Sequence, residues 1–218
     1  MKINPVNNVN HKGIPIADIK VKGIDSCYKL YKVNYADKEF LEKMYLSIDL
    51  KKLMPKMSQR DYVLWDEIIK NAISLSKSKD TKTIFETSDN KPCGIMNYKE
   101  ICNRYHVSYV ATFPTEEKKR IPCAGQILFN ELFKRFTQSD KDRIELSAIR
   151  EAPFDPISVY LKLGFRMSGG DDYCEYMGIN KNNAAGILLK QNDFITYNPI
   201  KNAQKIDLQD EIKLDTIV

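Results

Sequence analysis

The sequence has few of the residues that build metal sites or disulfide frameworks. Its 218 residues include two histidines and five cysteines, and the cysteines form no C-x-x-C pair. This pattern argues against a structural zinc site and against a set of disulfides. It is typical of free thiols in a reducing compartment, so we predict a cytoplasmic protein. A chain of this length buries enough surface to fold without such links.

Long apolar runs are also absent. No segment approaches the roughly 18 consecutive apolar residues of a membrane-spanning helix. The Asn-rich start of the chain lacks the apolar core of a signal peptide. We therefore expect no membrane partner. With 43% hydrophobic and 29% charged residues, the composition is that of a globular protein and argues against wholesale disorder.

The charge balance is mildly basic. The chain has 34 Lys and Arg against 29 Asp and Glu, a formal charge of +5. Such a bias fits an anionic ligand, an acidic protein, nucleic acid or simply a solvated lysine-rich surface. Tyr28, Tyr31 and Tyr35 lie among lysines, but they are only a faint sign of the aromatic and Arg-rich surface that binds nucleic acid. We do not expect nucleic acid as a partner.

The chain divides into three parts by composition. We expect a flexible basic arm over residues 1–25, a folded domain over 26–197 and a polar extension over 198–218. In the domain, a strand at 27–33 precedes two amphipathic helices. Asp37 is an N-cap candidate for the first helix, and Ser58 opens a near capping box for the second.

The rest of the domain reads as alternating strands and helices. A hairpin is expected at 81–98, followed by the most strand-like segment, 105–113, whose alternation predicts two faces. One face would carry Tyr105, Val107, Tyr109, Ala111 and Phe113, and the other His106, Ser108, Val110 and Thr112.

A helix with Ile127, Leu128 and Phe133 on one side follows, and then a strand at 143–149. Asp155-Pro156 opens a short helix that ends at Gly164. A last strand or hairpin is expected at 187–197. This order predicts a mixed α/β domain whose helices cover both faces of one sheet.

Two local motifs carry chemical information. The first is Arg120-Ile121-Pro122-Cys123-Ala124-Gly125, a loop that enters a helix. Free backbone N–H groups and the helix dipole make such a loop an anion site, and Lys118 and Lys119 add positive charge. The alternative is an ordinary helix N-terminus beside a solvated basic loop. The second is Tyr160-Leu161-Lys162-Leu163-Gly164-Phe165.

Together with the order of elements over roughly residues 27–195, these motifs resemble the GNAT superfamily of N-acetyltransferases. Arg120 and Gly125 match the family's cofactor loop, and the second motif is similar to the family's Tyr-x-Lys-Leu-Gly-Phe. Lys91-Pro92-x-Gly94 resembles its usual turn into the third strand. The cofactor loop is divergent, because Cys123 replaces the middle Gly and Pro122 lacks an N–H.

The resemblance implies a mixed, mostly antiparallel sheet with helices on both faces, and an acetyl-CoA-dependent N-acetyltransferase. A primary amine would attack the thioester directly. Acetyl-CoA would be the co-substrate, and the acceptor a polyamine-like molecule, an amino acid, or a protein terminus or lysine. The residues expected at the cofactor are Val110, Ala111, Thr112, Phe113, Lys118, Lys119, Arg120, Cys123, Ala124 and Gly125.

By the same resemblance, Tyr160 is the candidate general acid for the leaving thiolate. The alternative is a tyrosine that only packs in the core. His106 has a suitable pKa for the general base, although a strand-edge histidine without a catalytic role is the alternative. Glu100, Glu116 and Glu117 are weaker candidates. A Cys123–His106 pair would point to a Cys–His acyltransferase or hydrolase.

A function of another class also fits. The fold would persist without catalysis as a binding module, and the Lys-rich N-terminal region would contact an acidic protein or RNA. The altered residues Ile121, Pro122 and Cys123 favour this alternative, whereas Tyr160 and Gly125 favour the enzyme. The sequence leaves a homodimer open.

Overall fold

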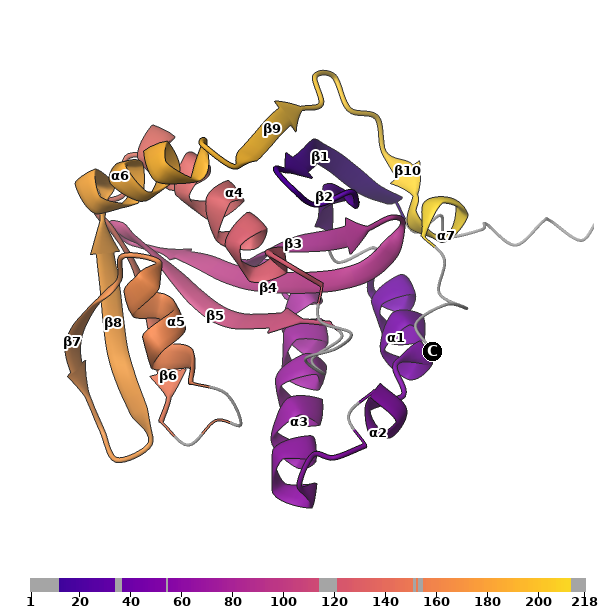
Figure 1. Cartoon of the computed structure of the whole chain (residues 1–218), viewed down its shortest axis with the longest axis horizontal. Coiled ribbons are helices and arrows are strands. Elements are labelled where there is room, and N and C mark those ends of the chain that lie inside the picture. Colours follow the sequence, from indigo (N-terminus) through magenta and orange to yellow (C-terminus); the bar gives the residue numbers. More distant parts are fainter. Residues whose placement is uncertain are drawn as a thin grey trace, which may run out of the picture.

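The computed structural model describes residues 12–33, 37–53, 55–113, 121–150, 152 and 155–212. In this part of the chain, ten strands form one sheet in the order β10-β1-β2-β3-β4-β5-β6-β8-β7, and β9 pairs with β1. Neighbouring strands are antiparallel except β5 and β6, which are parallel. The predicted α/β fold, a mostly antiparallel sheet with helices on both faces, is confirmed (Figure 1).

The bounds of the elements are as follows. The strands are β1 (Lys12–Val21), β2 (Cys27–Val33), β3 (Thr81–Ser88), β4 (Lys91–Ile101), β5 (Arg104–Thr112), β6 (Arg143–Ile149), β7 (Arg166–Gly170), β8 (Cys174–Asn180), β9 (Ile195–Pro199) and β10 (Ile206–Asp207). The helices are α1 (Lys38–Ser47), α2 (Leu50–Leu53), α3 (Gln59–Ser76), α4 (Ala124–Gln138), α5 (Pro156–Lys162), α6 (Lys181–Gln191) and α7 (Leu208–Glu211).

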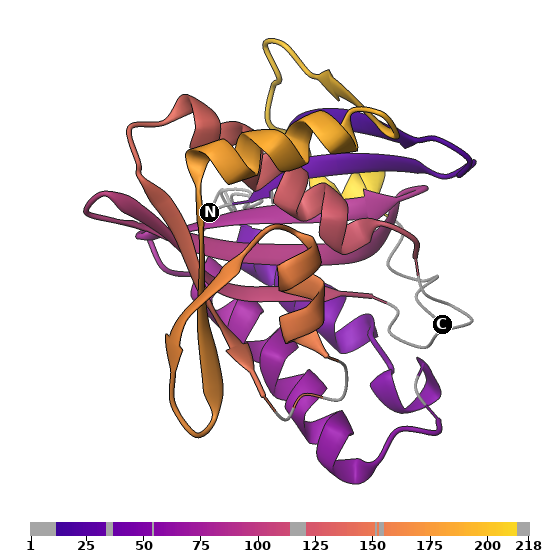
Figure 2. The same cartoon turned by 60° about the vertical axis from the view of Figure 1, so that its left-hand side comes forward.

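Two apolar cores hold the helices on the sheet. On one face, Ile127, Leu128 and Phe133 of α4 pack into a core that α5 and α6 extend. On the other face, Phe40 of α1 and Trp65 of α3 enter a second core. Figure 2 shows α4 and α6 above the sheet and α3 below it. None of the helices in the described ranges is both long and apolar enough to cross a membrane.

Local capping explains where several helices begin and end. The Ser58 hydroxyl accepts a hydrogen bond from the Asp61 amide at 3.1 Å, and the Asp155 carboxylate accepts one from the Ser158 amide at 3.0 Å. Gly164 ends α5 with φ +88°, a conformation that favours glycine. The Asp37 side chain makes no capping hydrogen bond. Asp37 is nevertheless the N-cap residue of α1, as predicted.

Both ends of the domain take part in the sheet. The prediction of a flexible arm is wrong for residues 12–21, because they form β1 between β2 and β9; residues 1–11 lie outside the described ranges. The C-terminal segment is not merely peripheral either. The Leu208 side chain packs on Gly13, so close that a Cβ at residue 13 would lie 2.5 Å from it.

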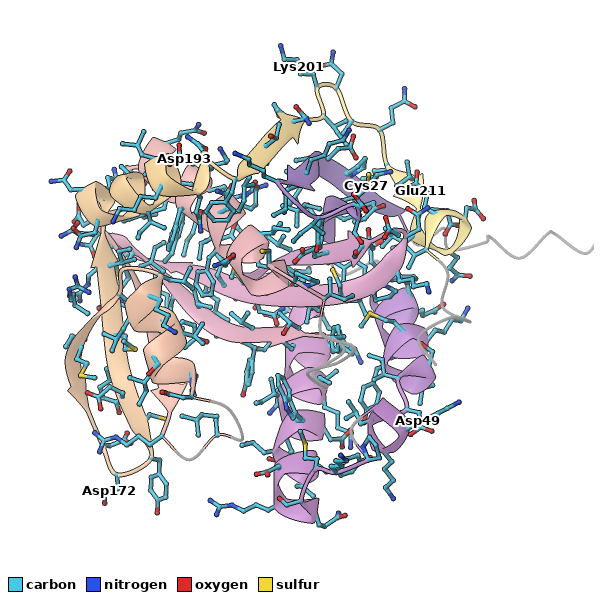
Figure 3. The ribbon with its side chains drawn as sticks, in the orientation of Figure 1. Cys27, Asp49, Asp172, Asp193, Lys201 and Glu211 are labelled. Carbon is cyan, nitrogen blue, oxygen red and sulfur yellow. The ribbon has the colours of Figure 1, made fainter. Side chains whose placement is uncertain are left out.

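Glu211 fixes the same corner of the sheet. Its carboxylate accepts a hydrogen bond from the Tyr31 hydroxyl at 3.1 Å. The same carboxylate forms an ion pair with the Lys29 ammonium group at 3.3 Å. Figure 3 labels Glu211 on the short helix α7. The C-terminal segment therefore closes over β1 and β2.

A helix replaces part of the expected last hairpin. Residues 181–191 form α6, and only residues 195–199 form a strand, β9. The Asn180 side chain starts α6 by accepting a hydrogen bond from the Asn183 amide at 2.9 Å. The sequence did not predict this helix, because it starts with asparagines and contains Gly186, and both residue types have low helix propensity.

Candidate active site

The two parallel strands at the middle of the sheet separate after a short paired stretch. β5 and β6 pair from Arg104↔Arg143 to Val107↔Leu146 and no further. β5 then continues to Thr112. Figure 1 shows the two strands diverging from this point. The backbone groups of Ser108–Thr112 on this side therefore have no strand partner within the described residues, and an extended ligand can pair with them.

A β-bulge lies where the separation begins. On β4, the consecutive residues Asn97 and Tyr98 pair with Tyr109 and Val107, so Ser108 is the extra residue. A bulge bends its strand and increases the local twist. We attribute the opening between β5 and β6 to this bend.

The bulge also changes which side chains share a face. Tyr105 and Val107 lie in the core beneath α4. After the bulge, Tyr109, Ala111 and Phe113 lie in the core beneath α3. The predicted strict alternation is therefore wrong for the second half of the strand. One extra residue moves every later side chain to the opposite face.

The N-terminus of α4 lies at the end of β5. A Cβ on Gly125 would be 3.8 Å from the Thr112 methyl group. Cys123 is the N-cap residue, and its side chain makes no capping hydrogen bond. The first helical hydrogen bond runs from the Ile127 amide to the Cys123 carbonyl at 2.9 Å. The amides of Ala124, Gly125 and Gln126 therefore have no carbonyl partner within α4 and form a potential anion site.

Cys123 adopts a backbone conformation that suits glycine better. Its φ is +63° in the left-handed region, which costs roughly 1–2 kcal/mol for a residue with a Cβ. The position is the one where Cys replaces the Gly of the resembling motif. The backbone at the start of α4 is therefore left-handed at Cys123 even though this residue has a Cβ.

A tyrosine from a distant strand supports the loop. The Tyr28 hydroxyl on β2 donates a 2.6 Å hydrogen bond to the Pro122 carbonyl. Burial raises the pKa of Tyr28, so its hydroxyl keeps the proton that it donates. This contact is not predictable from the sequence, because the two residues are 94 positions apart and no local signal connects them.

The residues predicted at the cofactor are buried, partly exposed or outside the described ranges. Ala111, Phe113 and Ala124 are buried, and Val110, Thr112, Cys123 and Gly125 are partly exposed along the opening and the start of α4. The Phe113 amide is already used, because it donates to the Cys93 carbonyl at 2.7 Å. Lys118, Lys119 and Arg120 lie outside the described residues, as do Glu116 and Glu117.

Tyr160 lies on the α4 face of the sheet, in an aromatic cluster. Its ring is 5.7 Å from that of Phe129 and 5.9 Å from that of Phe165, measured between centroids. Burial raises the pKa of Tyr160 to about 12. Its hydroxyl makes no hydrogen bond within the described part of the chain. A phenol in this state is protonated at neutral pH and can act as a proton donor.

His106 lies on the other face, toward α3. Burial lowers the pKa of His106, and Arg104 and Lys99 lower it further, whereas Glu145 raises it. The imidazole is therefore neutral near pH 7 and can accept a proton. Cys123 packs against the α4-side core, so the structure does not bring Cys123 and His106 together as the Cys–His alternative requires.

An open pocket adjoins His106 between α3 and β5. Its volume is about 460 Å³, within the range typical of small-molecule sites. The lining residues are Asn71, Ser74, Leu75, His106, Ser108 and Tyr109. Ser108 is the bulge residue, so the pocket reaches the point where β5 leaves β6. The α3 residues of this lining have no signature in the sequence, because each is an ordinary polar or apolar helix position.

The described residues contain no group of three or more His, Cys, Asp or Glu side chains placed to hold a metal ion. The five cysteines form no disulfide. The candidate site is therefore made of an unpaired strand edge, a helix N-terminus, a buried phenol on one face and a polar pocket on the other.

Comparison with known proteins identifies the fold. No sequence-family model matches the chain, and no curated protein matches it in sequence. Solved structures do match in shape. PaiA N-acetyltransferase from Thermoplasma acidophilum, in complex with coenzyme A, is 20% identical with a TM-score of 0.51, over 70% of this chain and 98% of that chain.

Two further structures extend this result. FdhC, a nucleotide-linked sugar GNAT, is 17% identical with a TM-score of 0.53, over 77% of this chain and 94% of that chain. RimJ from Mycobacterium smegmatis, in complex with CoA-disulfide, is 16% identical with a TM-score of 0.52, over 83% of this chain and 95% of that chain. The chain therefore has the fold of the GNAT N-acetyltransferases, as its motifs predicted.

Proposed function

We propose that the protein is an acetyl-CoA-dependent N-acetyltransferase that acts on a primary amine by direct attack. One observation carries this proposal: the open edge of β5 leads directly to the uncapped N-terminus of α4. A thioester carrier with an amide-rich arm and a diphosphate matches both parts of this surface. The coenzyme A complexes among the structures of the same fold support the choice of ligand.

Different segments of the chain bind different parts of acetyl-CoA. The amides of Ala124, Gly125 and Gln126 bind the diphosphate, because the helix dipole favours an anion there. The backbone of Ser108–Thr112 pairs with the pantetheine arm. Arg120, Lys118 and Lys119 are proposed to add charge at the diphosphate.

The chemistry needs a neutral amine, a polarised carbonyl and a proton for the leaving sulfur. The amine nitrogen attacks the thioester carbon, the C–S bond breaks, and the acetyl group remains on nitrogen as an amide. His106 accepts the proton that the amine loses, directly or through water. Tyr160 donates a proton to the departing thiolate, and solvent restores the proton of Tyr160.

Thermal unfolding in the presence of acetyl-CoA tests the binding step. A ligand that binds only the folded state raises the stability by RT ln(1 + [L]/Kd), about 2.7 kcal/mol at 100 times Kd. We expect a rise in Tm with both acetyl-CoA and CoA. Gly125→Glu should abolish this rise, because it places a carboxylate at the diphosphate without a steric clash.

Gly186→Glu is the matched control. It makes the same change on α6, where an added Cβ has no atom within 4 Å, so its Tm should still rise with acetyl-CoA. No rise for the unmodified protein at millimolar cofactor would contradict the proposal and favour the non-enzymatic binding module. An equal rise in both variants would show that the ligand binds elsewhere.

A further inference from the structure

The pocket between α3 and β5 is neutral and rich in hydrogen-bonding groups. Asn71 and Ser74 come from α3, and Ser108 and Tyr109 come from β5. These side chains provide amide and hydroxyl groups that can both donate and accept. No carboxylate lines the pocket. A ligand with several hydroxyl groups fits such a lining better than a ligand with several ammonium groups.

The charged groups around His106 are mostly cationic. Lys99 and Arg104 lower the pKa of His106, and Glu145 is the one acid that opposes them. Glu145 is already paired, because its oxygens lie 2.9 Å from the Arg104 Nε and 2.6 Å from an Arg143 terminal nitrogen. A cationic ligand would therefore find no unengaged carboxylate beside His106.

Of the charged residues that act on His106, Lys99 is the one without a counter-ion among the described residues. It pairs in register with His106 across β4 and β5, so the two side chains share the face that carries the pocket. Lys99 is half-buried, and its ammonium group makes no ion pair or hydrogen bond within the described ranges. An ammonium group without a counter-ion on this face of the sheet attracts an anion, and an anionic group of the ligand can supply it.

We infer that this pocket holds the acceptor, and that the acceptor is a small polyhydroxylated amine with one anionic group whose counter-ion is Lys99. The inference rests on the proposed function and adds the substrate class. The pocket volume of about 460 Å³ accommodates a monosaccharide with a phosphate or carboxylate group. Polyamines are the disfavoured class, because their recognition requires carboxylates that the lining lacks.

Steady-state kinetics with four amines test the class. Glucosamine 6-phosphate and glucosaminic acid carry a phosphate and a carboxylate, glucosamine carries neither, and spermidine is a polycation. We expect kcat/KM for the better anionic amino sugar to exceed that for glucosamine about tenfold or more, and spermidine to be the poorest acceptor. The two anionic arms distinguish a phosphate from a carboxylate.

Lys99→Gln tests the counter-ion. The ratio of kcat/KM between the better anionic amino sugar and glucosamine should fall about tenfold, mainly through KM. A folding defect would lower both values and leave the ratio intact. Lys190→Gln makes the same change on the exposed surface of α6 and should keep the ratio of the unmodified protein.

Ser74→Leu, a change at an exposed position of α3, tests whether the acceptor binds in this pocket. It should raise KM for the acceptor about tenfold or more while acetyl-CoA still raises Tm. Acetyl-CoA binding without turnover of either anionic amino sugar, or with spermidine preferred, would overturn this inference alone. Failure to bind acetyl-CoA would instead overturn the proposed function.

Discussion

The two faces of the sheet present different chemistry to the opening between β5 and β6. On the α4 face, Tyr160 lies among phenylalanine rings. On the α3 face, His106 lies in a polar pocket. Burial nevertheless acts on both in the same sense, because it disfavours the charged form of each group. It raises the pKa of Tyr160 to about 12 and lowers that of His106, so the acid is protonated and the base is neutral at the same pH.

Replacing the phenol should have the largest effect on this comparison. Tyr160→Phe removes only the hydroxyl and keeps the ring contacts with Phe129 and Phe165. We expect kcat to fall about 100-fold, in the range of general acid catalysis. The dissociation constant of acetyl-CoA should change far less. Equal kcat in the two proteins would remove Tyr160 from the mechanism.

The pH profile tests the other face. The kcat/KM value should fall on the acid side as His106 gains a proton, with a midpoint below the ordinary histidine value of 6.5, because burial lowers this pKa. The facing charges are Lys99, Arg104 and Glu145, and the α3 residues of the lining do not titrate. His106→Gln should remove this acid limb and lower kcat about tenfold. An unchanged limb in the variant would assign it to another group.

A buried acid on the α4 side gives a smaller effect, on stability. Glu86 is fully buried, and burial raises the pKa of its carboxyl well above the ordinary value of 4.5. The folded state then binds more protons than the unfolded state, so stability decreases as pH rises above about 4.5. Glu86→Gln removes this dependence. Its Tm relative to the unmodified protein should rise between pH 5 and pH 8, and a constant difference would contradict the assignment.

The smallest expected effect concerns the loop. Cys123→Gly removes the Cβ that is strained at a φ of +63°. It should raise the free energy of unfolding by about 1 kcal/mol, measured by urea denaturation. Cys27→Gly, at an exposed position without a positive φ, is the control and should not stabilise the protein. A loss of stability in Cys123→Gly would mean that the thiol contributes more than the strain costs.

Local signals predicted much of the fold. Ser58, Asp155 and Gly164 end or begin helices through contacts with residues close in the chain. The turn at Asp89 and Asn90, both with positive φ, joins β3 and β4 as expected. Such signals are readable because the partners are separated by a few residues.

Less of the site could be predicted, because its residues are far apart in the sequence or lie at an irregular point of a strand. The bulge at Ser108 has no signature in an otherwise alternating segment. The Tyr28 bond to Pro122 and the pocket between α3 and β5 each join segments that are far apart in the chain. The motif around Arg120–Gly125 was found because its function depends on backbone order near a helix start, which a short sequence pattern can encode.

Hydrogen–deuterium exchange with and without acetyl-CoA locates the cofactor on the protein. We expect the ligand to slow amide exchange at Val110–Thr112 on β5 and at Ala124–Gln126 on α4, and Gly125→Glu to remove both effects. Protection of a different surface, or of neither segment at saturating acetyl-CoA, would contradict the assignment of this opening as the cofactor site.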